Sequence, residues 1–412
     1  GASQTNATAS ATGVKKSAGS SANSQESAAT SRGNQAAGGT GSSGKTATGK
    51  ASKGGSDVSV AAAIAVNVQT SAATATIDGA LMVDATGTVA VRSSNNTDSA
   101  AQGDGSASTT SQSDAVGVGV AVNVVDMDNE ARIMAGTDVS ANGLTLGATM
   151  KDVGGNLTHS HVTKASSGAS GGDTGIAGSF AVAVVNSDTV AIMGGANSTL
   201  ALTGGAVDID ARSDTTQQTL ASAKGLSKGK SSTGVGAGIA LTVTFDTTDA
   251  GIENGTVMTG TANGFAVDVT SSLLPTEDDG AITEAQAGAA GNTAVGGGVA
   301  VTYIEADTDA RIGTGTGDFS MTGGALSVTA NRAANYTTRA DGEAAGGNVG
   351  VGASVALNIG QDDTDATVSR AMTTGTNTAA SATVATTATV ASITESKACL
   401  LYTSDAADDL TR

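Results

Sequence analysis

The chain has almost no aromatic residues, proline or cysteine. Its 412 residues include no Trp, 3 Tyr, 4 Phe, 1 Pro and 1 Cys. Aromatic side chains supply much of the buried area of a thick globular core, so we expect a thin core of Val, Ile, Leu and Ala. The single cysteine, Cys399, excludes an intrachain disulfide. No apolar run approaches the roughly 20 residues that span a bilayer, which predicts no membrane span.

Positive charge is also scarce. The formal net charge is −18, and residues 1–55 hold six of the 20 Lys and Arg residues but only one acid, Glu26. The rest of the chain is therefore strongly acidic and would repel a phosphate backbone. This balance predicts that nucleic acid is not a partner.

Glycine is abundant, with 58 residues, and it falls in a repeat. A block that reads as a β-strand starts at Val60, Val116, Ile176, Val235, Val295 and Val351, with spacings of 56 to 60 residues. A fixed period of this kind is typical of stacked repeat architectures. In each block, large β-branched residues alternate with Gly and Ala, so one face of the strand is nearly bare. Gly inside a strand indicates that another backbone comes close, and we expect a second layer against this face.

Each block is followed by acidic residues, by Ala-x-Ile or a close variant, and then by a glycine turn and a second strand. Asp favours turns, so we expect an acidic turn after each block, as at Glu305–Asp309. The second strands contain pairs such as Leu326 and Val328, and a polar stretch of variable length follows, such as Asp341–Asn348. We therefore expect three to five short strands per repeat, forming two or three rungs of a β-solenoid. At about 4.8 Å per rung, the array would be a rod of about 50–80 Å.

These patterns predict an all-β repetitive β-solenoid with three parts. Residues 1–54 are almost entirely small and polar, and we expect a flexible, disordered segment that is the enlarged loop of a preceding repeat. Residues 55–398 form the repeat array. The last 14 residues, CLLYTSDAADDLTR from Cys399 to Arg412, resemble a translated transposase-type sequencing adapter, and we interpret residues 399–412 as a non-native tail. We interpret the whole chain as an internal fragment of a longer protein.

Two motifs suggest chemistry but lack its context. Residues Gly39–Thr46 match the P-loop pattern, yet no apolar strand precedes them and no helical pattern follows. His159 and His161, the only histidines, would share a strand face as metal ligands must, but no cysteine lies near them and the motif does not recur. We interpret both histidines as exposed polar loop residues. The sequence predicts no catalytic residues and no cofactor-binding residues.

The acidic segments offer the one alternative that involves a metal. Carboxylate oxygens are the ligands that Ca²⁺ prefers, and the candidate ligands are Asp126, Asp128, Asp246, Asp249, Asp307, Asp309, Asp362 and Asp365. Their spacing is loose, and the first and third repeats lack the full set. Turn formation is the interpretation that we favour over calcium binding.

The repeat VGxGVAVxxxxxDTDAxI, followed by a Gly-Gly-x-Leu-x-Val-x-Ala strand, resembles the repeats of large secreted bacterial adhesins of the filamentous-haemagglutinin-like and leukotoxin-like type. The resemblance covers residues 55–398. It implies a right-handed parallel β-helix, export through an outer-membrane transporter, and an extracellular or cell-surface location. It also implies binding to a host or neighbouring cell surface, for example to a glycan or matrix component.

We therefore expect a non-catalytic stalk or passenger fragment of an adhesin, not an enzyme. Two alternatives stay open: a calcium-dependent surface-layer or matrix protein, and a fragment of a β-helix carbohydrate-active enzyme. The enzyme would need an acidic cluster in one repeat that the other repeats lack.

Overall fold

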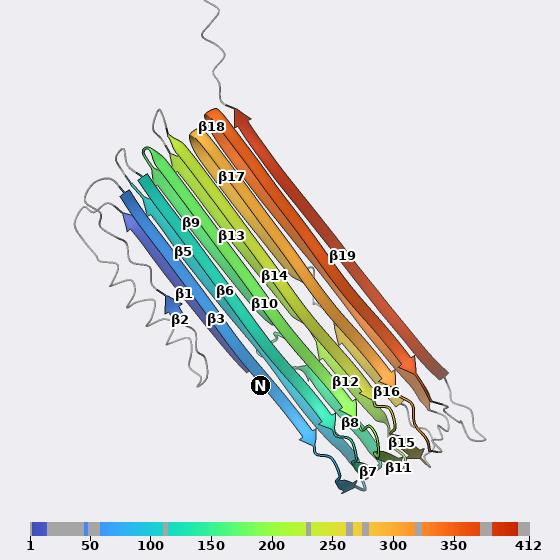
Figure 1. The fold of residues 1–412 in the computed structure, drawn as a ribbon. Coiled ribbons are helices and arrows are strands. Elements are labelled where there is room, and N and C mark those ends of the chain that lie inside the picture. Colours follow the sequence, from blue (N-terminus) through green and yellow to red (C-terminus); the bar gives the residue numbers. More distant parts are fainter. Residues whose placement is uncertain are drawn as a thin grey trace, which may run out of the picture.

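A computed structural model describes residues 2–14, 45–47, 58–109, 114–227, 232–260, 267–273, 280–317, 324–370 and 381–402. These residues form long parallel β-strands (Figure 1). Within these ranges no helix is long and apolar enough to cross a membrane. The fold is all-β and has the coiled architecture of a parallel β-solenoid, as the sequence predicts.

The six sequence blocks form one sheet, which we call the block layer. Its strands are β3 (Val58–Ile77), β6 (Asp114–Ile133), β10 (Thr174–Met193), β14 (Thr233–Ile252), and the second halves of β17 (Ala281–Ile312) and β18 (Ala325–Val368). Neighbouring strands pair in parallel, and equivalent residues of successive repeats lie side by side. The short β2 (Lys45–Ala47) pairs antiparallel with β3 at one edge.

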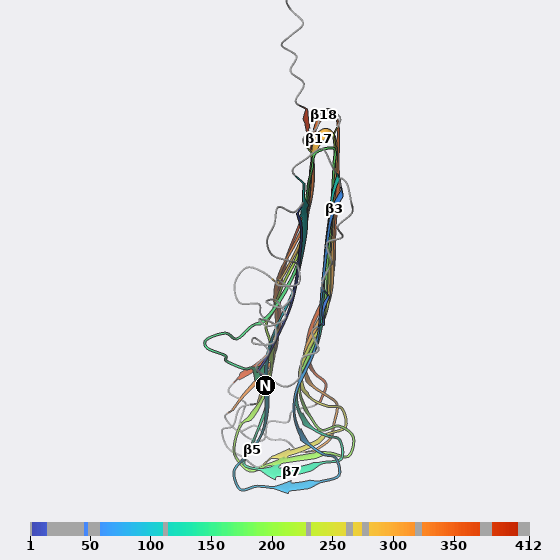
Figure 2. The same ribbon diagram turned by 90° about the vertical axis from the view of Figure 1, so that its left-hand side faces the viewer.

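A second sheet, the return layer, faces the block layer. Its strands are β1 (Ala2–Val14), β5 (Thr88–Ser108), β8 (Gly143–Met150) with β9 (His159–Gly171), β12 (Val207–Ser213) with β13 (Thr215–Ser227), β16 (Val267–Leu273) with the first half of β17, the first half of β18, and β19 (Ser381–Tyr402). The two layers lie close at one end and spread apart at the other (Figure 2). The wide end is bridged by a small base sheet of β4 (Met82–Asp84), β7 (Asp138–Ala141), β11 (Thr199–Leu202) and β15 (Val257–Gly260).

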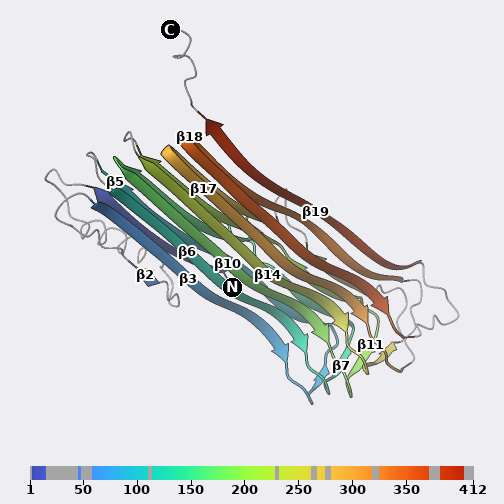
Figure 3. The same ribbon diagram turned by 45° about the horizontal axis from the view of Figure 1, so that its top comes forward.

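Each repeat makes one coil, which corrects the expectation of two or three rungs. Val60 pairs with Val116, and Val116 pairs with Ile176, so one full period separates strands that are direct neighbours. Six block strands spaced about 4.8 Å apart extend only about 24 Å along the stack, whereas a 20-residue strand is about 66 Å long. The array is thus broad and short rather than a rod of 50–80 Å, and its first and last coils lie at opposite ends of the stack (Figure 3).

The coil is right-handed. In Figure 1 the near block layer runs toward the lower right, the return layer runs back behind it, and successive coils step toward the upper right. This is the hand that parallel crossover connections almost always take, and it agrees with the implied right-handed β-helix.

The narrow part between the layers is filled by small residues. Three hydrophobic clusters of the described residues there consist entirely of buried alanines, such as Ala121, Ala181 and Ala240. Where glycine replaces alanine, the opposite backbone takes the place of the side chain: a Cβ on Gly105 would lie 1.8 Å from the Val118 carbonyl oxygen. The prediction that the bare face of each block lies against another layer is confirmed.

The wide end holds the larger apolar side chains. Its cluster gathers Ile133, Ile252 and Ile312 from the Ala-x-Ile segments, Leu200 and Met258 from the base sheet, and the predicted second strands. A buried Ile, Leu or Met side chain contributes about 1.5–3 kcal/mol, against roughly 0.8 kcal/mol for one methyl group. Most of the hydrophobic stabilisation therefore comes from this end of the coil.

Two predicted irregular segments are strands instead. The acidic residues after each block are not in a turn: Asp126–Ile133 completes β6, and Glu305–Asp309 lies inside β17. The polar stretch Asp341–Asn348 belongs to β18. In both cases small or apolar residues continue at alternate positions facing inward, so the pattern of a strand is kept although the outward residues are polar.

The ends of the chain also differ from expectation. Residues 2–14 were predicted to be flexible, but they form β1, which pairs with β5 from Asn96 to Ser108 and buries Ala7, Ala9 and Ala11. Small side chains suffice here because the narrow space admits nothing larger. The position of β1, one coil before β5, is that of a preceding repeat's return strand. Residues 15–44 and 48–57 lie outside the described residues.

At the other end, β19 extends past residue 398 to Tyr402, so the strand includes the start of the segment that we interpret as a non-native tail. In register, Leu400 and Tyr402 take the positions of Ala344 and Gly346. The small-residue pattern therefore stops at this point, and residues 403–412 lie outside the described part of the chain.

Adjacent glycines of β17 test the close approach of the layers. A Cβ on Gly296 would lie 2.1 Å from the Glu343 carbonyl oxygen, whereas a Cβ on Gly297 would meet nothing within 4 Å. We expect Gly296→Ala to lower the free energy of unfolding by about 2–3 kcal/mol through overpacking. Gly297→Ala, the matched control, should raise it by about 0.5–1 kcal/mol. Urea denaturation measures both, and equal effects of the two changes would contradict the account.

Candidate interaction surface

The outer side of the block layer is apolar over half the length of its strands. This apolar face consists of alternate residues in six ranges, from Val60 to Val68, Val116 to Val124, Ile176 to Val184, Val235 to Val243, Val295 to Tyr303 and Val351 to Ile359. None of these outward residues is charged, and eleven of the large ones are at least 38% exposed, with Val355 at 57%. An exposed apolar area of this extent marks an interaction surface.

The narrow space behind the apolar face determines on which side of a block strand a large residue can lie. Alternate residues of a strand point to opposite sides, and the inner side accepts only Gly, Ala and small polar residues. The large residues of each block, such as Val120, Phe180 and Ile239, must therefore point outward. Register aligns them in rows along the stack, so that Val120, Phe180 and Ile239 are direct neighbours.

The outer side of the return layer is different in character. Outward residues there include Lys164, Lys224, Glu284 and Arg339. Arg339 forms ion pairs with Glu284 at 3.5 Å and with Glu395 at 3.2 Å. In the described strands, the outer side of the return layer therefore mixes charged with apolar residues, whereas the apolar face of the block layer carries no charge.

Acidic rows follow the apolar face toward the wide end. The parallel register places Asp128 beside Asp188, Asp307 beside Asp363, and Asp309 between Asp249 and Asp365. Partial burial, with repulsion from Asp126, Asp188 and Glu130, raises the pKa of Asp128. Burial and repulsion from Asp249 likewise raise the pKa of Asp309, although Arg311 opposes the shift.

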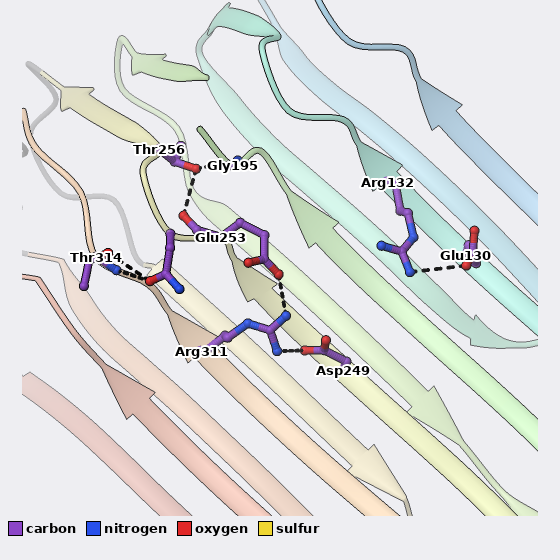
Figure 4. A network of polar contacts seen from close by, with 9 residues as sticks. Glu130, Arg132, Gly195, Asp249, Glu253, Thr256, Arg311 and Thr314 are labelled. Atoms are coloured by element: carbon purple, nitrogen blue, oxygen red, sulfur yellow. Dashed lines mark hydrogen bonds and ion pairs between the residues drawn. The ribbon is translucent and has the colours of Figure 1, made fainter. Parts of the chain in front are cut away.

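Arginines compensate part of this charge (Figure 4). Arg311 binds both Asp249 and Glu253, and Arg132 pairs with Glu130 at 3.2 Å. Beside them, Thr256 accepts a hydrogen bond from the Gly195 amide and donates one to the Glu253 carbonyl oxygen, which ties neighbouring coils together. Arg311 of β17 joins its coil to the neighbouring coil of Asp249 and Glu253, whereas the Arg132–Glu130 pair lies within β6.

The eight candidate calcium ligands are divided between the two sides of the block layer. Asp126, Asp128, Asp249, Asp307, Asp309 and Asp365 face outward, whereas Asp246 and Asp362 face inward. Asp246 and Asp249 are three residues apart on a strand, so the structure does not bring them together, and the same holds for Asp362 and Asp365. Among the described residues, no three His, Cys, Asp or Glu side chains form a group that could hold a metal ion.

The two histidines lie in the core, which corrects their interpretation as exposed loop residues. His159 and His161 of β9 are 2% and 1% exposed and their rings stack at 6.5 Å. Their shared strand face is confirmed. The Thr97 amide donates to His159 Nδ1, and His161 Nδ1 lies 2.8 Å from Ser99 Oγ. Burial lowers the pKa of His159 to about 4 and, together with repulsion from His159, that of His161 to about 3.

Polar residues also form an internal ladder that the sequence did not reveal. A chain of threonine hydroxyls passes alternately between the two layers, with O–O distances of 2.7–2.8 Å. In order along this chain the residues are Thr219, Thr242, Thr283, Thr302 and Thr338. Asn67 and Asn123 continue the polar column toward the first coil. Their spacing by one repeat is the signal that could have identified them.

Near the last coils, the core contains a charged cluster. Arg332 pairs with Asp362 at 2.8 Å, and Tyr336 donates a hydrogen bond to the same carboxylate. Asp246 is buried beside them, and burial raises its pKa to about 6 although Arg332 opposes the shift. The cavity among these residues is about 10 Å³, which is about the size of one water molecule. A substrate therefore does not fit here.

The P-loop-like segment falls mostly outside the described residues, which include only Lys45 and Thr46 of its eight positions. Both lie in β2, paired antiparallel with β3. The helix that a P-loop places after its lysine is absent at these two residues.

The low pKa values of the histidines predict a measurable titration. The folded state should keep both rings neutral down to about pH 4, whereas in urea both should titrate near 6.5. Their contribution to stability is thus present above pH 6.5 and lost as the pH falls toward 4, by up to ~1.4 kcal/mol per pH unit for each ring. NMR of the two imidazoles measures this, and His161→Gln should reduce the slope. A midpoint near 6.5 in the folded protein would show that the rings are not buried.

Comparisons with known proteins give no assignment. No protein-family model matches the chain, and neither the curated proteins nor the solved structures that were compared include a match.

Proposed function

We propose that the chain is a non-catalytic structural segment, a stalk or passenger fragment, of a secreted or cell-surface bacterial adhesin. The observation that supports this role most is the uniform stacking of coils. All six block strands pair in parallel with their neighbours, so each coil supplies the hydrogen-bonding edge for the next one. Such an array gains reach by adding coils.

The surface chemistry suits an extracellular place. The return layer and the acidic rows present hydrated charges, while the apolar face offers a broad surface for contact. We propose that the segment is exported through an outer-membrane transporter and displayed at the cell surface. Its partners would be a host or neighbouring cell surface, including glycan or matrix components.

Labelling of intact cells tests this role. Antibodies against the purified chain should label unpermeabilised cells of the organism that carries the gene, and external protease should remove the label. Fab fragments should reduce adhesion if this segment carries the adhesive surface, and leave it unchanged if the segment is only a stalk. Label that appears only after permeabilisation would contradict both versions, and a cytoplasmic protein serves as the control for cell integrity.

A calcium-dependent surface-layer or matrix protein is the second candidate. Its support is electrostatic: Asp309 lies between Asp249 and Asp365, and a divalent cation would relieve their mutual repulsion. Among the described residues, however, no three carboxylates form a group that could hold a metal ion. The carbohydrate-active alternative has no comparable support in the described part of the chain, since the buried cluster of Arg332, Asp362 and Asp246 surrounds a cavity too small for a sugar.

Calorimetry separates the two candidates. A plain structural role predicts the same Tm in calcium and in EDTA. The calcium role predicts a higher Tm in calcium, which Asp309→Asn should reduce and Asp104→Asn, on the return layer, should not. Without calcium, Asp309→Asn should slightly raise the Tm, because burial and repulsion already disfavour the ionised carboxylate.

A further inference from the structure

We propose that the apolar face of the block layer binds a second copy of this chain, face to face. The apolar face has five rows of outward residues that run along the stack, numbered here from the start of the blocks, so that Ile239 lies in the third row. The two copies would be related by a two-fold axis that runs along the stack direction through this middle row. In this arrangement the block strands of the two copies run antiparallel across the interface. The proposal is independent of the adhesin role, since it concerns a surface of the folded chain itself.

The extent of the face fits this occupant. Six strands about 4.8 Å apart, each with nine residues at about 3.3 Å, cover roughly 850 Å². A standard stable interface buries about 800 Å² on each partner. Soluble monomers rarely expose an apolar patch of this size, and no described residue of this chain covers it.

The rows of the face are complementary to one another under the proposed symmetry. The second row is small except at Val118, with Gly178, Ala237 and Gly297 as neighbours. The fourth row is large, with Val182, Leu241 and Val301. A two-fold axis along the third row places the second row of each copy opposite the fourth row of the other. The ridge of one copy then fits the groove of its partner.

Charge selects the antiparallel orientation. The acidic rows, such as Asp128 with Asp188 and Asp307 with Asp363, lie at one end of the apolar face only. A parallel arrangement would place these rows over the same rows of the partner, where like charges repel. The antiparallel arrangement moves them to opposite ends, beyond the partner's apolar face and into solvent.

The first test is the mass of the full chain in solution. Light scattering after size exclusion should give twice the 39.1 kDa of one chain. Ile239→Lys combined with Val299→Lys, both in the third row, should return the mass to that of one chain. Ile282→Lys is the matched control, because Ile282 also points outward from β17 but lies in the return layer. Circular dichroism shows whether each variant keeps its strands.

Cysteine crosslinking tests the orientation, in a chain in which the exposed Cys399 is replaced by Ser. Facing sheets lie about 10 Å apart, which is too far for a direct disulfide, so a short bismaleimide joins the cysteines. With it, Ile239→Cys should give a crosslinked dimer, because each third-row residue faces its own copy across the axis. Val243→Cys alone should not crosslink, whereas Val235→Cys together with Val243→Cys should. A dimer that lacks the Ile239 crosslink would overturn the antiparallel arrangement.

Other outcomes overturn the dimer itself. They are a wild-type chain that stays at 39.1 kDa at all concentrations, a dimer that persists in the third-row variant, or a monomer that sediments with phosphatidylcholine vesicles. The last result would assign the apolar face to a lipid surface instead of a second copy.

Discussion

Backbone atoms of the two layers approach so closely that carbonyl oxygens occupy the space where side chains would otherwise lie. A Cβ on Gly119 would lie 2.0 Å from the Ser166 carbonyl oxygen, and one on Gly225 would lie 1.9 Å from that of Val235. Stacked sheets normally stand about 10 Å apart with interdigitating side chains. Here the inner positions accept glycine, alanine or a small polar residue, and the rest of the structure adapts to this limit.

The first consequence is a core with two parts, which are stabilised by different interactions. Alanines in the narrow part bury one methyl group each, so backbone hydrogen bonds along the stack and hydroxyl ladders such as Thr242 and Thr302 define that region. The base sheet opens the coil just enough for Leu200, Ile252 and Met258. The Ala-x-Ile segment is therefore the point at which the coil changes from backbone contact to ordinary hydrophobic packing.

The parts of the fold that depend on alternation of large and small residues along a strand could be predicted from the sequence. The prediction is wrong where the acidic or polar composition of a segment was given more weight than this alternation. Period 2 and repetition both mark the bare faces of the blocks and the second strands, such as Leu326 with Val328, and both predictions are confirmed. Asp favours turns, and this composition predicts turns in the acidic segments; the segments are strands because inward-facing residues continue in phase, as at Met127, Asn129 and Ala131. The sequence did not predict one coil per repeat. The length of these strands depends on pairing in register with the next repeat, and a local sequence pattern does not reveal that pairing. The buried histidines were missed for a related reason, since only the tertiary register shows that β9 faces the block layer at that point.

The outer side of the block layer needs a separate explanation, because the close approach of the layers does not dictate which residues point outward. Strand propensity alone would accept Thr as readily as Val or Ile, and the return layer does place Thr216, Thr329 and Thr337 outward. The apolar face contains no Thr among its outward residues; its fourth row reads Val66, Val122, Val182, Leu241, Val301 and Leu357. Exclusion of water from the apolar face by a second copy accounts for the absence of Thr, whereas strand propensity does not. The same reasoning explains why the charges lie beyond the apolar face and not within it. An unpaired carboxylate on a covered surface would lose its hydration at a large cost in free energy, whereas a carboxylate on the part of the strand beyond that surface stays hydrated.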